Sequence, residues 1–130
     1  MSYQHALQTL QWSTHIEVDE PDGSTYFDGT DFEPSKELEQ RLLTDWENFQ
    51  AQAIELGFDP EKHRITYIDL SEGDYWDYAA HDFILTRNGH GAGFWDGDWS
   101  EPIATKLTEL CEKFGEINIY LSDENLLEAY

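Results

Sequence analysis

Imidazole and carboxylate side chains gather in one short segment, residues 81–98. His81, Asp82, His90, Asp96 and Asp98 are residue types that bind divalent metal ions or transfer protons. If the segment is a β-hairpin, His81 and His90 lie at opposite ends of it, roughly 20 Å apart at ~3.3 Å per residue, so one ion cannot contact both. We therefore interpret His81 and Asp96 as a hydrogen-bonded cross-strand pair, and we expect no catalytic residue, metal or cofactor. A small metal-dependent enzyme that uses this pair is the alternative.

The hairpin is predicted from Asn88-Gly89, which lies between two apolar runs. Asn-Gly is the preferred pair for a two-residue type I′ turn, because both positions need positive φ. This turn would fix a register over about 82–96 in which Phe83 lies opposite Phe94 on one face. Gly93 would lie on the other face, in a trough that we expect a packed helix to fill.

We expect the rest of this segment to act as a scaffold for the hairpin. Arg87, beside the turn, is predicted to be exposed. The scaffold residues are His81, Asp82, Arg87, Asn88, Gly89, His90, Gly91, Gly93, Trp95 and Asp96.

The run HDFILTRNGHGAGFWD, residues 81–96, resembles a motif of a family of small bacteriophage proteins and their relatives in host genomes. Members carry a run similar to HDFxLTRNGHGxGFWD, with tryptophan common where this chain has Ile84. Weaker similarities lie in residues 10–14 and 107–115. The resemblance implies a phage origin and a shared hairpin-plus-helix fold. It implies no activity.

The composition is strongly acidic: 28 Asp and Glu oppose 7 Lys and Arg in 130 residues, a formal net charge of −21. So few basic residues cannot form the basic footprint that direct binding to nucleic acid or to an anionic membrane requires. Aromatic residues, 15% of the chain, can support a core, so we expect a folded protein. Cys111 is the single cysteine, which excludes an intrachain disulfide. No apolar run approaches the ~18 residues of a membrane span and no secretion signal is evident, so we expect a cytoplasmic protein, in the host cell.

The apolar pattern predicts a small single α+β domain over residues 1–130. Leu38, Leu42, Trp46 and Phe49 recur at helical spacing within a helix at 35–56, with Ser35 at its N-cap position. A second main helix is expected at 101–114 and a short one at about 3–11. The two main helices would pack against an antiparallel sheet made of the hairpin at about 82–96 and a strand at 116–121. Residues 60–70 fit either a strand or a helix.

Two acidic segments without basic residues, 17–33 and 69–77, are predicted to be loops that form the contact surface for a partner. This surface would comprise Asp19, Glu20, Asp22, Asp28, Asp31, Glu72, Asp74, Tyr75, Trp76 and Asp77. The charge density is of the magnitude of duplex DNA, which carries one charge per ~1.7 Å. We therefore expect a phage protein that binds and inhibits or redirects a host protein with a basic, nucleic-acid-binding surface, as an anti-restriction or anti-CRISPR mimic would. An acidic phage–host adaptor without mimicry is a second alternative, and a homodimer is possible.

Overall fold

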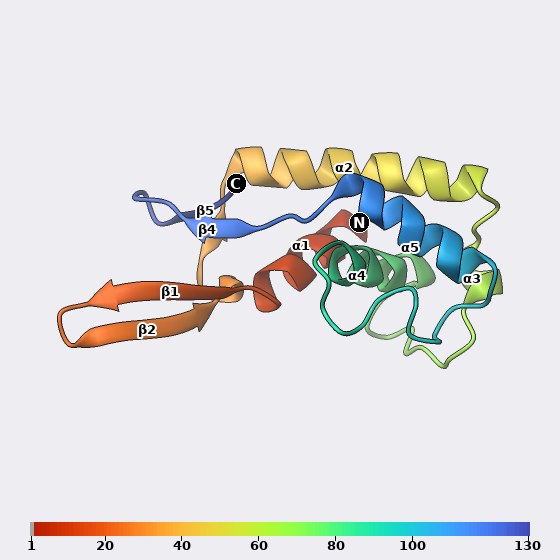
Figure 1. The fold of residues 1–130 in the computed structure, drawn as a ribbon, viewed down its shortest axis with the longest axis horizontal. Coiled ribbons are helices and arrows are strands. Elements are labelled where there is room, and N and C mark those ends of the chain that lie inside the picture. Colours follow the sequence, from red (N-terminus) through yellow and green to blue (C-terminus); the bar gives the residue numbers. More distant parts are fainter. Residues whose placement is uncertain (1) are drawn as a thin grey trace.

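The computed structural model describes residues 2–130, apart from the side chains of Asp19 and Glu20 (Figure 1). Its helices are α1 (Ser2–Trp12), the short 3-10 helix η1 (Gly29–Asp31), α2 (Lys36–Glu55), α3 (Pro60–His63), α4 (Tyr75–Arg87) and α5 (Ile103–Phe114). Its strands are β1 (His15–Glu20), β2 (Gly23–Asp28), β3 (Glu33–Pro34), β4 (Ile119–Leu121) and β5 (Leu126–Ala129). The fold class is α+β, as predicted. Within residues 2–130, no helix has both the length and the apolar character needed to cross a bilayer.

The two main predicted helices are confirmed as α2 and α5. Ser35 caps α2, because its Oγ accepts a hydrogen bond of 3.0 Å from the backbone N–H of Leu38. One stripe of α2 is buried, from Leu38 to Ala53, and α5, which packs on α2, buries Leu107 and Leu110. The short N-terminal helix is also present, as α1.

Two small sheets lie at one end of the helices (Figure 1). Strands β1 and β2 form an antiparallel ribbon that extends from the end of α1, with His15 opposite Asp28 and Glu20 opposite Gly23. The other sheet has the order β3-β5-β4, in which β3 is parallel and β4 antiparallel to β5. The predicted strand at 116–121 is present in its second half, as β4.

An aromatic cluster joins α2, α4 and the loop after α4. Phe49 of α2 stacks on Phe83 of α4 with ring centroids 4.4 Å apart. Phe94, in the loop after α4, stacks on the ring of Phe49 with centroids 5.7 Å apart. Phe58 and Trp99 extend the cluster edge to face, 5.4 Å apart. Such pairs add to the hydrophobic stabilisation of the core and hold α4 in the centre of the molecule.

The predicted hairpin at 82–96 is wrong, because residues 82–87 belong to α4 and residues 88–102 follow it as a loop. The helix begins at a capping box: the Asp74 carboxylate accepts from the N–H of Asp77, and the Asp77 carboxylate accepts from the N–H of Asp74, both at 2.8 Å. It ends in a Schellman motif, in which the N–H of His90 donates to the carbonyl of Leu85 and Gly89 has a φ of 65°. Asn88-Gly89 therefore terminates a helix here.

The physical reason for this error is that α4 is buried over most of its circumference. Ala79, Ala80, Phe83, Ile84 and Leu85 are all buried, so the helix shows little of the one-sided periodicity that identifies a helix in sequence. Phe83 and Phe94 both enter the core, but they come from a helix and a loop and are not a cross-strand pair. The predicted trough on a hairpin face does not exist: Gly93 lies in the loop after α4 and packs back on that helix, where a Cβ built on it would lie 3.3 Å from Cα of Thr86.

The acidic segments are also more ordered than predicted. Residues 17–33 form most of the β1–β2 ribbon together with η1, where a loop was expected. Pro21 and Asp22 make the two-residue connection of the ribbon. Residues 69–74 are irregular, whereas 75–77 already belong to α4. Of the ambiguous segment 60–70, only Pro60–His63 is helical.

Candidate functional site

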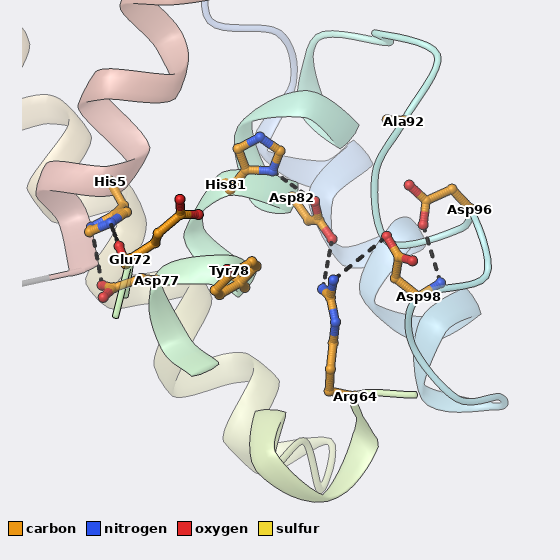
Figure 2. Close-up of a pocket in the computed structure, with 10 residues that line it drawn as sticks. All are labelled: His5, Arg64, Glu72, Asp77, Tyr78, His81, Asp82, Ala92, Asp96 and Asp98. Atoms are coloured by element: carbon orange, nitrogen blue, oxygen red, sulfur yellow. Dashed lines mark hydrogen bonds and ion pairs between the residues drawn. The ribbon is translucent and has the colours of Figure 1, made fainter. Parts of the chain in front are cut away.

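A cavity of about 450 Å³ lies between the N-terminal part of α1, the outer side of α4 and the loops that carry Arg64 and residues 92–98 (Figure 2). Five of its lining residues are acidic and three carry basic or imidazole groups. The lining residues are His5, Arg64, Glu72, Asp77, Tyr78, His81, Asp82, Ala92, Asp96 and Asp98. Its volume lies in the range of small-ligand pockets, about 300–1,000 Å³.

Asp82 forms the base of this cavity and is held from several sides. Its Oδ2 accepts a hydrogen bond of 2.6 Å from the indole Nε1 of Trp99, and its Oδ1 lies 3.0 Å from Nδ1 of His81. Only 7% of its side chain is exposed. A buried carboxylate needs such partners, and they fix the side-chain positions of His81 and Trp99 around it.

Arg64 lies beside Asp82 with 9% of its side chain exposed. Its guanidinium is held between two aromatic rings, 4.8 Å from the centroid of Trp99 and 5.2 Å from that of Tyr78. Nη1 is 4.0 Å from Asp82 Oδ2 and Nη2 is 3.8 Å from Asp98 Oδ2, so both ion pairs are longer than hydrogen bonds. The buried Nε has no hydrogen-bond partner among the described residues. Figure 2 shows the guanidinium directed into the space between the two carboxylates.

Asp98 and Asp96 form the loop side of the cavity. Burial raises the pKa of Asp98, with a further contribution from the adjacent charge of Asp96, while Thr66 and Arg64 act in the opposite direction. Thr66 Oγ1 donates to Asp98 Oδ1 at 3.1 Å. The Asp96 carboxylate accepts from the backbone N–H groups of Gly93 and Asp98, both at 3.3 Å. These bonds give the loop a defined shape beside Arg64.

The opposite wall joins α1 to the start of α4. His5 Nδ1 lies 3.3 Å from Asp77 Oδ1, and the Nε2 atom of His5 lies 3.4 Å from the carbonyl oxygen of Glu72. Asp77 thus belongs both to the capping box of α4 and to this contact. The Glu72 side chain is exposed at the rim.

His81 and Asp96 line the same cavity, but they are not the hydrogen-bonded pair that we predicted. The partner of His81 is its neighbour Asp82, whose Oδ1 lies 3.0 Å from Nδ1 of the ring. Among the side chains that the structure describes, no group of three or more His, Cys, Asp and Glu residues is placed to hold a metal ion. The site therefore offers carboxylate acceptors, one guanidinium and an oriented imidazole.

The predicted contact surface is divided between the two ends of α1. Asp22 is exposed at the turn of the β1–β2 ribbon, Asp31 is exposed in η1, and Asp28 caps η1 through the N–H of Thr30. Glu72 lies instead beside His5, near the start of α1. The side chains of Asp19 and Glu20 lie outside the described part of the chain.

Two aromatic residues predicted as contact anchors lie at the start of α4. Trp76 is half-buried and packs edge to face on Trp46 and Phe58, with centroids 5.9 and 5.5 Å away, so its ring contributes to the core. Tyr75 is half-buried as well. Asp74 of the predicted surface is the N-cap of the same helix.

Arg87, predicted to be exposed, is instead buried, because it lies on the inner side of α4. Its Nη1 pairs with Asp45 of α2 at 3.1 Å and its Nε donates to the Gly115 carbonyl at 2.8 Å. Burial lowers the pKa of Arg87, while Asp45 acts against that shift. Asn88, beside it, exchanges two hydrogen bonds with the backbone of Ile117. Both residues thus tie α4 to the end of α5.

The remaining scaffold residues line the loop after α4, where His90, Gly91 and Trp95 are exposed. No local pattern in the sequence indicates the roles of His5, Arg64 and Tyr78. They come from three separate elements, and only the packing of α1 and of the 64–70 segment on α4 brings them together. Arg64 was also in the segment whose structure the sequence left open.

No family model matches the chain, and no match is found among curated proteins or solved structures.

Proposed function

We propose that this is a bacteriophage protein that binds a host protein through the basic surface with which that host protein binds nucleic acid, and so inhibits or redirects it. The carboxylates would occupy the positions of phosphate groups against Lys and Arg of the partner. The net charge of −21 and the resemblance of residues 81–96 to phage proteins support this function. The main observation in its favour is the distribution of acidic and basic residues over the surface of the fold.

The two longest stretches without Lys or Arg are residues 1–35 and 65–86, with seven acidic residues in the first and five in the second. They are far apart in sequence, but α1 packs directly on α4. In Figure 1 the β1–β2 ribbon, α1 and α4 are drawn below α2, and α1 and α4 pack against α2. We call the part of the surface built by these elements the base-free side.

The exposed basic residues lie elsewhere. Arg64 and Arg87 are paired with carboxylates and mostly buried, so they add little positive charge to the surface. The other five are exposed on α2, α3 and α5: Lys36, Arg41, Lys62, Lys106 and Lys113. A partner that approaches the base-free side therefore meets carboxylates without competing cations, which favours fast, salt-sensitive association with a basic surface.

The test compares two variants with the same change in net charge. A base-free-side variant carries Glu17→Gln, Asp22→Asn, Asp31→Asn and Glu72→Gln, all at exposed positions. The control variant carries Glu47→Gln, Glu55→Gln, Glu109→Gln and Glu112→Gln on α2 and α5, which are also exposed. The immobilised proteins are incubated with host lysate at low and high salt, and the protein retained by the native chain is then purified.

The proposal expects duplex DNA to displace the protein from the purified partner. It also expects the base-free-side variant to associate more slowly and with a weaker salt dependence than the control variant. A partner that binds nucleic acid and this protein simultaneously contradicts mimicry and favours an adaptor. If the two variants associate at the same rate and with the same salt dependence, the assignment of the contact surface to the base-free side is contradicted.

A further inference from the structure

Exposed large apolar side chains lie on the segments that line the acidic cavity. Ile65 and Tyr67, the latter 88% exposed, flank Thr66, and the backbone N–H of Ile65 and the hydroxyl of Thr66 both donate to Asp98. Trp12 stacks on His81, Leu70 lies two residues before Glu72, and Trp95 precedes Asp96. We call the apolar margin the set Trp12, Ile65, Tyr67, Leu70 and Trp95. Exposed apolar clusters of this kind mark interaction sites, and Trp and Tyr are enriched among the residues that dominate binding energy.

The charge of the cavity selects a cationic group. Five carboxylates line it, and the guanidinium of Arg64 is the only permanent positive charge among the lining residues. Glu72 is exposed at the rim, and no ion pair between its side chain and a described residue compensates its charge. A phosphate or a free carboxylate would be repelled there, whereas an ammonium or guanidinium group would be attracted.

Arg64 indicates that the same occupant must also present a hydrogen-bond acceptor. Its side chain is nine-tenths buried and directed into the cavity (Figure 2), yet its Nε has no hydrogen-bond partner in the described part of the chain, and its Nη atoms are 3.8–4.0 Å from the carboxylates of Asp82 and Asp98. Unsatisfied buried donors are costly. An acceptor of low charge, such as a peptide carbonyl, can approach the Nη atoms without the repulsion that an additional carboxylate would meet.

We propose that the cavity and the apolar margin bind a short segment of the partner protein that inserts one arginine or lysine side chain. The cationic head lies against Glu72 and Asp96, a backbone carbonyl of the segment accepts from Arg64, and neighbouring apolar side chains pack on Tyr67 and Trp95. One segment of peptide supplies all three chemical groups, which a metal ion or a small anion does not. This inference rests on the proposed function and names the part of the base-free side that gives it specificity.

The first test uses a defined probe and NMR spectroscopy of the ¹⁵N-labelled protein. The probe is the acetylated and amidated peptide Ala-Leu-Arg-Leu-Ala, and its control has neutral citrulline in place of arginine. The indole N–H signals of Trp12 and Trp95 report on the margin, that of Trp99 on the base of the cavity, and that of buried Trp46 serves as the reference. We expect the arginine peptide to shift the first three signals and to bind at least about fivefold more tightly than the citrulline peptide.

Two outcomes of this titration would overturn the inference. One is equal binding of the arginine and citrulline peptides, because the carboxylates would then not select a cation. The other is displacement of the arginine peptide by Zn²⁺ or Ca²⁺ at equimolar concentration with the same shifts, because the cavity would then be a metal site.

Single variants separate the cavity from general charge attraction. Glu72→Gln and Tyr67→Ser change exposed side chains, so the fold should be retained, and each should weaken binding of the arginine peptide about five- to tenfold. Glu109→Gln makes the same change in net charge on α5 and should leave binding unchanged. An equal effect of Glu109→Gln and Glu72→Gln would contradict a specific site.

The same variants distinguish this inference from the proposed function. If Glu72→Gln and Tyr67→Ser leave the affinity for the purified host partner unchanged while the base-free-side variant lowers it, charge mimicry stands and the cavity inference falls. If both single variants lower the affinity for the host partner and for the arginine peptide by similar factors, the result supports insertion of a basic side chain of the partner into the cavity.

Discussion

Replacement of Gly93 by alanine should destabilise the protein strongly, because two effects add at this position. Gly93 has a φ of 157°, which L side chains rarely adopt, and a new Cβ would overlap Oγ1 of Thr86 and lie 3.3 Å from its Cα. The same Oγ1 accepts a hydrogen bond of 3.0 Å from the N–H of Phe94. Backbone strain of about 1–3 kcal/mol, overpacking of about 1–3 kcal/mol and a weakened hydrogen bond of about 1 kcal/mol give a loss of about 3–7 kcal/mol.

This loss is large against the whole stability of a domain of this size, about 6–20 kcal/mol at 0.05–0.15 kcal/mol per residue. Urea unfolding followed by circular dichroism measures it. Gly97→Ala is the matched control, since Gly97 has a φ of 98° but nothing within 4 Å of a built Cβ, so only the backbone strain applies.

A second background isolates the contact with α4. Thr86→Ala removes the hydroxyl that the new methyl group would overlap, so Gly93→Ala should cost at least about 1 kcal/mol less in this background than in the native chain. The packing argument is refuted if Gly93→Ala and Gly97→Ala are equally destabilising, or if Thr86→Ala leaves the cost of Gly93→Ala unchanged.

Four further predictions follow from single contacts. Arg87→Ala should lower the free energy of unfolding in urea by about 3–5 kcal/mol, because it leaves a charge without its buried partner; a loss below 1 kcal/mol would refute this. Asp74→Ala should cost about 1 kcal/mol through loss of the helix cap, and Asp74→Asn less, because asparagine keeps the acceptor. Hydrogen bonds from the Thr30 hydroxyl and, to a lesser extent, from its N–H hold the pKa of Asp28 below its usual value. The Asp28 carboxylate therefore stabilises the fold above its unfolded pKa, and this stabilisation is lost as pH falls through its folded pKa. Thr30→Ala should raise the pKa of Asp28 in an NMR titration. Burial raises the pKa of Cys111, so thiol labelling at pH 8 should proceed only as fast as the protein unfolds, and rapid labelling of the native protein would contradict the packing.

The helices α2 and α5 could be predicted from sequence because each has one apolar stripe and one solvated face. Leu38, Leu42 and Trp46 recur at the spacing of a helix, and Ser35 marks its start through local hydrogen bonding. These signals depend only on neighbours within a few residues, so they need no knowledge of the rest of the fold. The acidic character and the exclusion of a basic binding surface likewise follow from composition alone.

Helix α4 was mistaken for half of a hairpin because its environment is set by other elements. Asn88-Gly89 suits both a type I′ turn and a Schellman motif, and the decision between them depends on what packs around the preceding residues. Here α1 and α5 pack against α4, and Phe49 of α2 stacks on its Phe83, so apolar residues occupy most of its circumference. Buried Phe83 and Ile84 therefore carry no periodic signal.

Composition and local apolar spacing predict a folded, acidic α+β protein in which α2 and α5 are helices, and they place chemistry-bearing residues in 81–98. The contact of His81 with Asp82, the burial of Arg87 and the position of Arg64 between Asp82 and Asp98 depend on how distant parts of the chain pack. The difference lies in the sequence distance over which each interaction acts. Helix caps and amphipathic stripes are made by residues close in the chain, whereas a cavity and the side chosen by each polar group depend on which distant surfaces pack against it and exclude water.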